Sequence, residues 1–186
     1  MSVLTATGDN SAPNMLAPLP IAIQAADGAQ LAGIYYPCLN PSSAVLICSG
    51  IGLNQKVYAD FARWLNKEGF VVLTFDYRGI GESLFGMPVR KSLAKQHEWG
   101  QSDMTAALAH LHSRHPDIPL QMIAHNVAAA LMGLMNNHSL LSGVVSIGDS
   151  ALYVPQVAGI NRISANLFFR YYVSLCTSWL GYVPLK

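Results

Sequence analysis

Two polar residues, His125 and Asn126, interrupt an apolar stretch and are well placed for chemistry. The apolar run 120–124 precedes them, and a helix-favouring run, 127–131, follows at once. Strand, tight turn and helix form the layout that holds a nucleophile at the end of a buried strand. In such a turn a hydroxyl oxygen attacks after a histidine takes its proton. Asn126 is no such nucleophile, because resonance ties up the lone pair of its carboxamide nitrogen.

Two glycine loops follow other apolar runs. Residues 49–52 read Ser-Gly-Ile-Gly, and residues 76–83 read Asp-Tyr-Arg-Gly-Ile-Gly-Glu-Ser. In the second loop, Gly79 and Gly81 suit the backbone of a tight turn, and Asp76 and Arg78 suit its hydrogen-bonded anchors. The first loop has two interpretations, since its glycines either make a plain turn or leave a backbone amide free for a substrate.

The remaining candidate ligands predict neither a metal nor a cofactor. The three cysteines, Cys38, Cys48 and Cys176, are too scattered for a disulfide framework or a zinc site. The histidines show no ligand spacing. Free cysteines suit a reducing compartment, so we expect a cytoplasmic protein.

Composition narrows the class of protein further. The chain has 186 residues, of which 52% are hydrophobic and 11% charged, as expected of strands that helices bury on both faces. The formal net charge of +1 gives no electrostatic reason to expect nucleic acid or an anionic membrane. We expect no secretory signal, because the N-terminus lacks a basic region followed by an apolar stretch. We expect no membrane span, because the most apolar stretch, 163–183, is broken by Arg170.

The order of elements predicts the fold class. Asp27-Gly28 separates two short β-like runs, 21–25 and 30–36, as in a hairpin. Buried strands are expected at 44–48, 70–75, 120–124 and 143–148, with helices between them. Strands alternating with helices indicate an α/β protein with a parallel sheet.

The predicted helices have distinct apolar faces. The helix at 103–112 places Met104, Ala107, Leu108 and Leu111 on one face, and a third helix is expected from 127 to about 135. For the helix at 56–67 the spacing predicts a buried face made of Val57, Tyr58, Phe61, Ala62, Trp64 and Leu65.

At this point the chain resembles a known family. Residues 49–150 are similar to the first part of an α/β-hydrolase of the serine-aminopeptidase-like type. The resemblance is carried by the Ser-Gly-Ile-Gly loop, the D-x-R-G-x-G-x-S loop at 76–83, Trp-Gly-Gln-Ser-Asp at 99–103, and the turn at 125–126. It implies a mostly parallel sheet with helices on both faces, truncated after about the sixth strand plus a cap-like helical segment.

The resemblance also implies a division of the chain. A flexible N-terminal tail would occupy residues 1–17, an incomplete hydrolase core residues 18–150, and the start of a cap-like helical segment residues 151–186. The core would then end on an exposed strand with apolar faces, which invites self-association.

Roles at the turn follow from the same resemblance. Asn126 would occupy the nucleophile position, with His125 and Ala128 beside it in the elbow. The backbone amides of Ile51, Gly52 and Val127 would form the oxyanion hole, and residues 76–81 would be a structural loop.

The chain departs from the family pattern in two respects. Family elbows read Gly-x-Ser-x-Gly, whereas this one has Ala124, Asn126 and Ala128 at the three fixed positions. Small residues and an asparagine still suit a strained turn, but asparagine cannot attack. The triad order places an acid and then a histidine after the nucleophile, and no histidine follows His138.

These observations leave three hypotheses open. The chain is a protein of serine ester or amide hydrolase ancestry that is catalytically impaired or inactive; or a pseudoenzyme that binds a ligand or partner; or a truncated fragment of a larger hydrolase, including a decayed product without its own function. The second hypothesis predicts an acyl-type ligand in a pocket beneath the cap, lined by Ile51, Asn126, Val127, Tyr153, Phe168, Phe169, Tyr171 and Tyr172.

Overall fold

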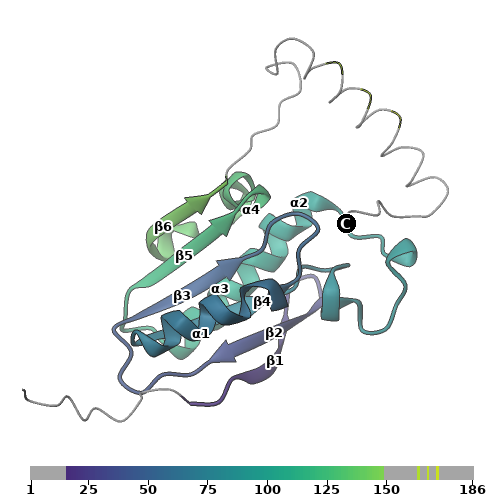
Figure 1. Ribbon diagram of the computed structural model, residues 1–186. Coiled ribbons are helices and arrows are strands. Elements are labelled where there is room, and N and C mark those ends of the chain that lie inside the picture. Colours follow the sequence, from purple (N-terminus) through teal and green to yellow (C-terminus); the bar gives the residue numbers. More distant parts are fainter. Residues whose placement is uncertain (1–15, 149–162, 164–166, 168–170, 172–186) are drawn as a thin grey trace, which may run out of the picture.

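A six-stranded mixed sheet forms the centre of the protein in the computed structural model, which describes residues 16–148 together with Ile163, Leu167 and Tyr171. The strand order is β1-β2-β4-β3-β5-β6 (Figure 1). The strands are β1 (Leu19–Gln24), β2 (Gln30–Tyr36), β3 (Ser43–Cys48), β4 (Phe70–Phe75), β5 (Leu120–His125) and β6 (Leu141–Ile147).

The strand directions confirm the predicted topology. The hairpin strands β1 and β2 are antiparallel, and β2 also pairs antiparallel with β4. The pairs β3–β4, β3–β5 and β5–β6 are parallel. Gly28 makes the hairpin turn with a φ of 87°, a left-handed conformation that glycine adopts without strain.

The helical elements connect the strands. The α-helices are α1 (Ala59–Lys67), α2 (Gln96–Glu98), α3 (Thr105–Arg114) and α4 (Val127–Leu131). The other helical turns are η1 (Gln55–Tyr58), η2 (Gly81–Leu84), η3 (Val89–Lys91), the π-helical η4 (Trp99–Met104), η5 (Met132–Leu134) and η6 (His138–Leu140). No helix in the described part of the chain is both long and apolar enough to cross a membrane.

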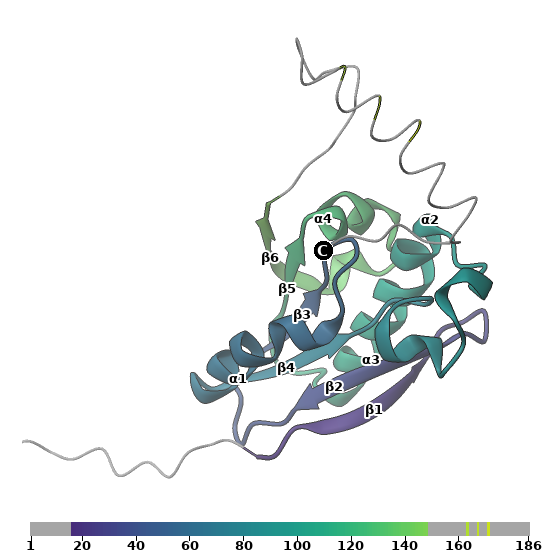
Figure 2. The same cartoon turned by 45° about the vertical axis from the view of Figure 1, so that its right-hand side comes forward.

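Helices cover both faces of the sheet, as predicted. Along β3, Ala44 and Leu46 belong to the larger core cluster, which includes side chains of α3 and α4. Val45 and Ile47 point to the opposite face, where they pack with the buried side of α1. The sheet is therefore a middle layer between α1 and the α3–α4 pair (Figure 2).

The predicted buried face of the first helix is partly wrong. Val57, Phe61 and Trp64 are 62%, 39% and 54% exposed, and the two aromatic rings stack on each other. Asn66 is buried instead, because its side-chain amide donates hydrogen bonds to the carbonyl oxygens of Tyr36, Pro37 and Phe70. These bonds link α1 to the ends of β2 and β4, and they set the rotation of the helix.

Two other predicted elements differ from the structure. The burial predicted for the strand at 143–148 from its composition is wrong, whereas the exposed apolar edge expected at the end of the core is present. This strand is β6, an edge strand whose Val144, Val145 and Ile147 are 41%, 55% and 46% exposed. The helix expected from 127 to about 135 is α-helical only to Leu131 and tightens into η5. The proposed tail at 1–17 and the cap-like segment at 151–186 lie largely outside the described residues.

Candidate functional site

The strand–turn–helix at residues 120–131 forms a sharp elbow. Asn126 lies between β5 and α4 with φ 54° and ψ −116°, a backbone conformation that asparagine tolerates better than most residues. Its amide donates to the carbonyl oxygen of Ile147 at 2.8 Å, and its side-chain nitrogen lies 3.4 Å from the carbonyl oxygen of Gly148. Both contacts bind the elbow to the end of β6.

The loop after β3 lies directly against this elbow. A Cβ atom placed on Gly50 would lie 2.9 Å from Nδ1 of His125 and 3.3 Å from Cβ of Asn126. The two segments meet because β3 and β5 are parallel neighbours, with Cys48 paired to Ala124 in the last register position. Only glycine allows the backbone to approach so closely.

Tyr58 joins the loop and the elbow by hydrogen bonds. Its hydroxyl accepts the Gly50 amide at 2.9 Å and lies 2.7 Å from Nδ1 of His125. Since the hydroxyl oxygen accepts from the amide, its own proton is available to Nδ1, which favours the His125 tautomer protonated on Nε2. Burial raises the pKa of Tyr58, so the hydroxyl keeps this proton. Sequence periodicity had placed Tyr58 on an apolar helix face, and no local pattern signals its polar role.

The three predicted oxyanion-hole amides lie at the ends of the same two strands. Ile51 and Gly52 belong to a turn closed by the Leu53 amide and the Gly50 carbonyl oxygen, at 3.2 Å, and Gly52 has a φ of 74°. Val127 is the first residue of α4, where a backbone N–H has no acceptor within the helix. Ala128 is buried beneath the turn.

Asp76 connects the loops that follow β3 and β4. Its carboxylate accepts the backbone amides of Gln55 at 2.7 Å and Glu82 at 2.9 Å. Burial raises the pKa of this carboxyl group, and the two amide bonds oppose that shift. A Cβ atom on Gly81 would lie 2.4 Å from Oδ2 of Asp76, so a side chain is excluded there. Sequence reasoning missed Gln55, a fully buried polar residue.

Arg78 is the centre of an ion-pair network. Its guanidinium lies 2.7 Å from carboxylate oxygens of Asp27 and of the fully buried Asp103, and 3.8 Å from Glu98. The Arg78 amide donates to Asp103 at 2.9 Å, and its carbonyl oxygen accepts the indole N–H of Trp99 at 3.2 Å. The network ties the hairpin turn, the β4 loop and the π-helical turn together.

Gly79, beside Arg78, allows a further close approach. A Cβ atom there would lie 2.4 Å from Oγ of Ser92, and the residue has a φ of 76°. The loop from Gly79 to Ser92 therefore folds back on itself at a point where only glycine fits.

The predicted ligand pocket beneath a cap falls largely outside the described residues. Tyr153, Phe168, Phe169 and Tyr172 are not among them, and Tyr171 is 63% exposed. Two described hollows, each of about 460 Å³, lie elsewhere. The first lies between β1 and α3, and the second lies between the start of β2 and the loop after β4.

Comparison with protein families settles the ancestry of this fold. Residues 40–175 match the family described as serine aminopeptidase, S33, a span that contains both glycine loops and the elbow. The chain belongs to the serine aminopeptidase S33 family. The family resemblance and the α/β-hydrolase fold predicted from the sequence are thereby confirmed.

A protein of Mycobacterium tuberculosis is similar to part of this chain in sequence. This S33-family chain is 37% identical over 95 residues to an uncharacterized protein of Mycobacterium tuberculosis, an alignment that covers 47% of this chain and 34% of the relative. The same match is found in a second strain of that organism. The aligned region is thus about a third of the curated relative's length.

Solved structures share the fold at low sequence identity. A carboxyl esterase from Bacillus coagulans superposes with a TM-score of 0.66 at 19% identity, covering 89% of this chain and 55% of the esterase. A monoglyceride lipase from Saccharomyces cerevisiae gives a TM-score of 0.66 at 18% identity, covering 91% of this chain and 54% of the lipase. The S33-family chain therefore spans about half the length of these structures.

Proposed function

We propose that this chain is an S33-family protein of serine hydrolase ancestry that binds an acyl-type carbonyl group at the elbow and turns it over poorly or not at all. One observation carries the proposal: Asn126 holds the strained backbone of a nucleophile elbow, with φ 54° and ψ −116°, but offers no attacking atom. In this proposal the chain keeps the backbone turn of the elbow and lacks the nucleophile that the turn would present.

Binding without turnover is chemically reasonable at such a turn. A carbonyl oxygen needs hydrogen-bond donors, and the backbone amides at Val127 and in the 51–52 turn are the donors we propose. None of these donors depends on the side chain at position 126. Because the oxyanion of a tetrahedral intermediate forms only after attack, these amides can bind a ground-state carbonyl but have no intermediate to stabilise.

A second proposal is supported by the lengths of the relatives. The chain covers 55% of the Bacillus esterase and 54% of the yeast lipase. We propose as the alternative that these residues are part of a longer hydrolase whose acid and base follow Lys186. Sequencing the DNA beyond the Lys186 codon tests this directly. An in-frame continuation that encodes an aspartate and a histidine would support it, and a stop codon at once would refute it.

Ester turnover and ligand binding together test the first proposal. We expect hydrolysis of p-nitrophenyl butyrate at the rate of the buffer blank for both the wild type and Asn126→Ala, with an active carboxyl esterase as the positive control. Butyrate or decanoate should raise the melting temperature of both proteins, because a ligand present at about 100 times its Kd stabilises a fold by about 2.7 kcal/mol. Turnover that Asn126→Ala abolishes, or no thermal shift with any acyl ligand, would refute the proposal.

A further inference from the structure

The loop between η2 and α2 exposes both apolar and basic side chains. Four large apolar side chains in it are 44–91% exposed: Phe85, Met87, Val89 and Leu93. Three exposed cations lie among or just beyond them: Arg90, Lys91 and Lys95. We call these seven residues the loop surface.

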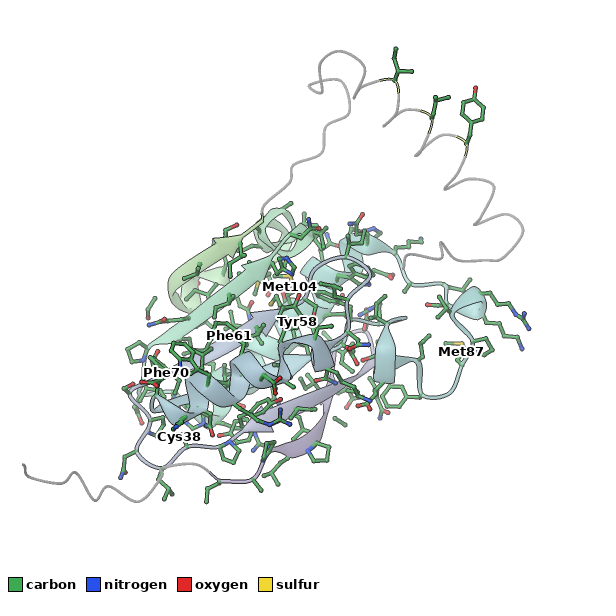
Figure 3. The ribbon with its side chains drawn as sticks, in the orientation of Figure 1. Cys38, Tyr58, Phe61, Phe70, Met87 and Met104 are labelled. Carbon is green, nitrogen blue, oxygen red and sulfur yellow. The ribbon has the colours of Figure 1, made fainter. Side chains whose placement is uncertain are left out.

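The loop surface projects from one end of the protein. Figure 3 labels Met87 at the outer end of this loop and places Cys38 and Phe70 at the opposite end of the molecule. The backbone conformation of Phe85 also carries an energetic cost, since its φ of 47° is unusual for a bulky residue. Phe85 is 59% exposed, so it gains little burial in return within the protein.

The positive charge of the loop surface is uncompensated. In the part of the chain that the structure describes, no carboxylate lies within ion-pair distance of Arg90, Lys91 or Lys95. The two acidic residues that flank the loop are engaged elsewhere, Glu82 with Lys56 at 2.8 Å and Glu98 near Arg78. The chain's net charge of +1 therefore conceals a local cluster of three cations.

We propose that the loop surface docks the protein onto an anionic lipid–water interface. Exposed apolar side chains interleaved with lysine and arginine match such an interface, where apolar groups enter the boundary between headgroups and acyl chains and cations meet the phosphates. Either property alone would suit other partners, but a projecting loop that carries both is complementary to an anionic membrane. The proposal does not depend on whether the elbow turns over an ester.

Vesicle co-sedimentation of the 186-residue chain tests the proposal. The vesicles are phosphatidylcholine alone or phosphatidylcholine with about one-third phosphatidylserine, at about 0.05 M and about 0.5 M salt. We expect binding to the anionic vesicles at low salt, weakened by high salt, and little binding to the neutral ones. Arg90→Gln, Lys91→Gln and Lys95→Gln should each lower the partition coefficient about five-fold, and the triple variant about 100-fold.

Matched variants separate the loop surface from general surface effects. Leu93→Ser should weaken binding several-fold, whereas Leu39→Ser, a change of an exposed leucine beside Cys38, should have no effect. Lys67→Gln at the end of α1 serves as the control for Lys91→Gln. All of these residues are exposed, so unchanged melting temperatures would show that folding is intact.

The following outcomes would overturn the proposal. These are absence of binding to anionic vesicles at low salt, equal binding to neutral vesicles, or binding that the triple variant leaves unchanged. Failure of the ester and fatty-acid experiments at the elbow would not change this result, because vesicle binding is measured without any acyl ligand.

Discussion

Replacing Arg78 by methionine keeps an aliphatic chain of similar length and removes the charge that pairs with Asp103. The Asp103 side chain is fully buried, and that of Arg78 is only 13% exposed. Loss of one partner from a buried ion pair costs about 3–5 kcal/mol, because the remaining charge is left uncompensated. One hydrogen bond to Asp103 survives, from the Arg78 backbone amide, which places the expected loss near 3 kcal/mol.

The contribution of Asp27 to this loss is small. Its side chain is 41% exposed, so solvent screens its pairing with Arg78, and we expect no more than about 0.5 kcal/mol from it. The total of about 3–3.5 kcal/mol is a large share of the 5–15 kcal/mol by which a typical domain is stable.

Urea unfolding followed by circular dichroism measures this loss. Arg63→Met is the matched control, since Arg63 pairs with Asp60 on the surface and should contribute about 0.5 kcal/mol or less. The double variant Arg78→Met/Asp103→Leu completes a thermodynamic cycle and should be destabilised much less than the sum of the two single variants. A loss below about 1 kcal/mol for Arg78→Met, or additivity in the cycle, would refute this account of the network.

Three further perturbations have expected outcomes. Tyr58→Phe removes the acceptor of a buried loop amide, so we expect a loss of about 1–3 kcal/mol in urea unfolding, and no loss would show that the bridge is dispensable. Gly81→Ala should lower the free energy of unfolding by about 2–4 kcal/mol, because it combines a φ of 49° with a steric clash. The control Gly28→Ala, at a φ of 87° with no atom within 4 Å, should lower it by about 1 kcal/mol. Equal losses for the two variants would contradict the clash at Gly81. The hydrogen bond from Arg78 holds the pKa of Asp27 below its usual 3.8, so its stabilisation is present above pH 3.8 and is lost as the pH falls through the folded-state pKa. The stability difference between the wild type and Asp27→Asn should therefore vanish in acid, and a difference that persists at about pH 2 would contradict the linkage.

The sheet was predictable because its strands carry their own signal. Continuous apolar runs rich in β-branched residues mark β3 and β4, and the structure buries every residue of β3. β6 gave the same signal but is exposed, since burial depends on neighbouring elements and not on the strand's own composition. Periodicity likewise predicted that Trp64 is buried, whereas the three carbonyl partners of Asn66 decide the orientation of α1.

The candidate site was predictable only where the chain itself has an unusual pattern. A turn at Asn126 follows from the residues around it, and the structure has the positive φ that the turn requires. The partners of Arg78 and the bridge through Tyr58 join segments that are distant in the sequence. No spacing rule connects them, because parallel strands bring their loops together only after the sheet has formed. The roles of Ile51, Gly52 and Val127 as donors remain predictions.

The backbone contacts of the elbow fix its conformation, whereas the side chain at position 126 decides its chemistry. The Ile147 carbonyl oxygen holds the backbone at position 126 by accepting its amide. Gly50 packs so closely against His125 that position 50 has no room for a side chain. The bond from the Asn126 amide to the Ile147 carbonyl oxygen is a backbone bond, so it does not depend on which side chain stands at position 126. For protein engineering, the position is therefore suited to saturation mutagenesis, because new nucleophiles can be tried there on a preformed turn, while changes at Gly50 would disturb the turn itself.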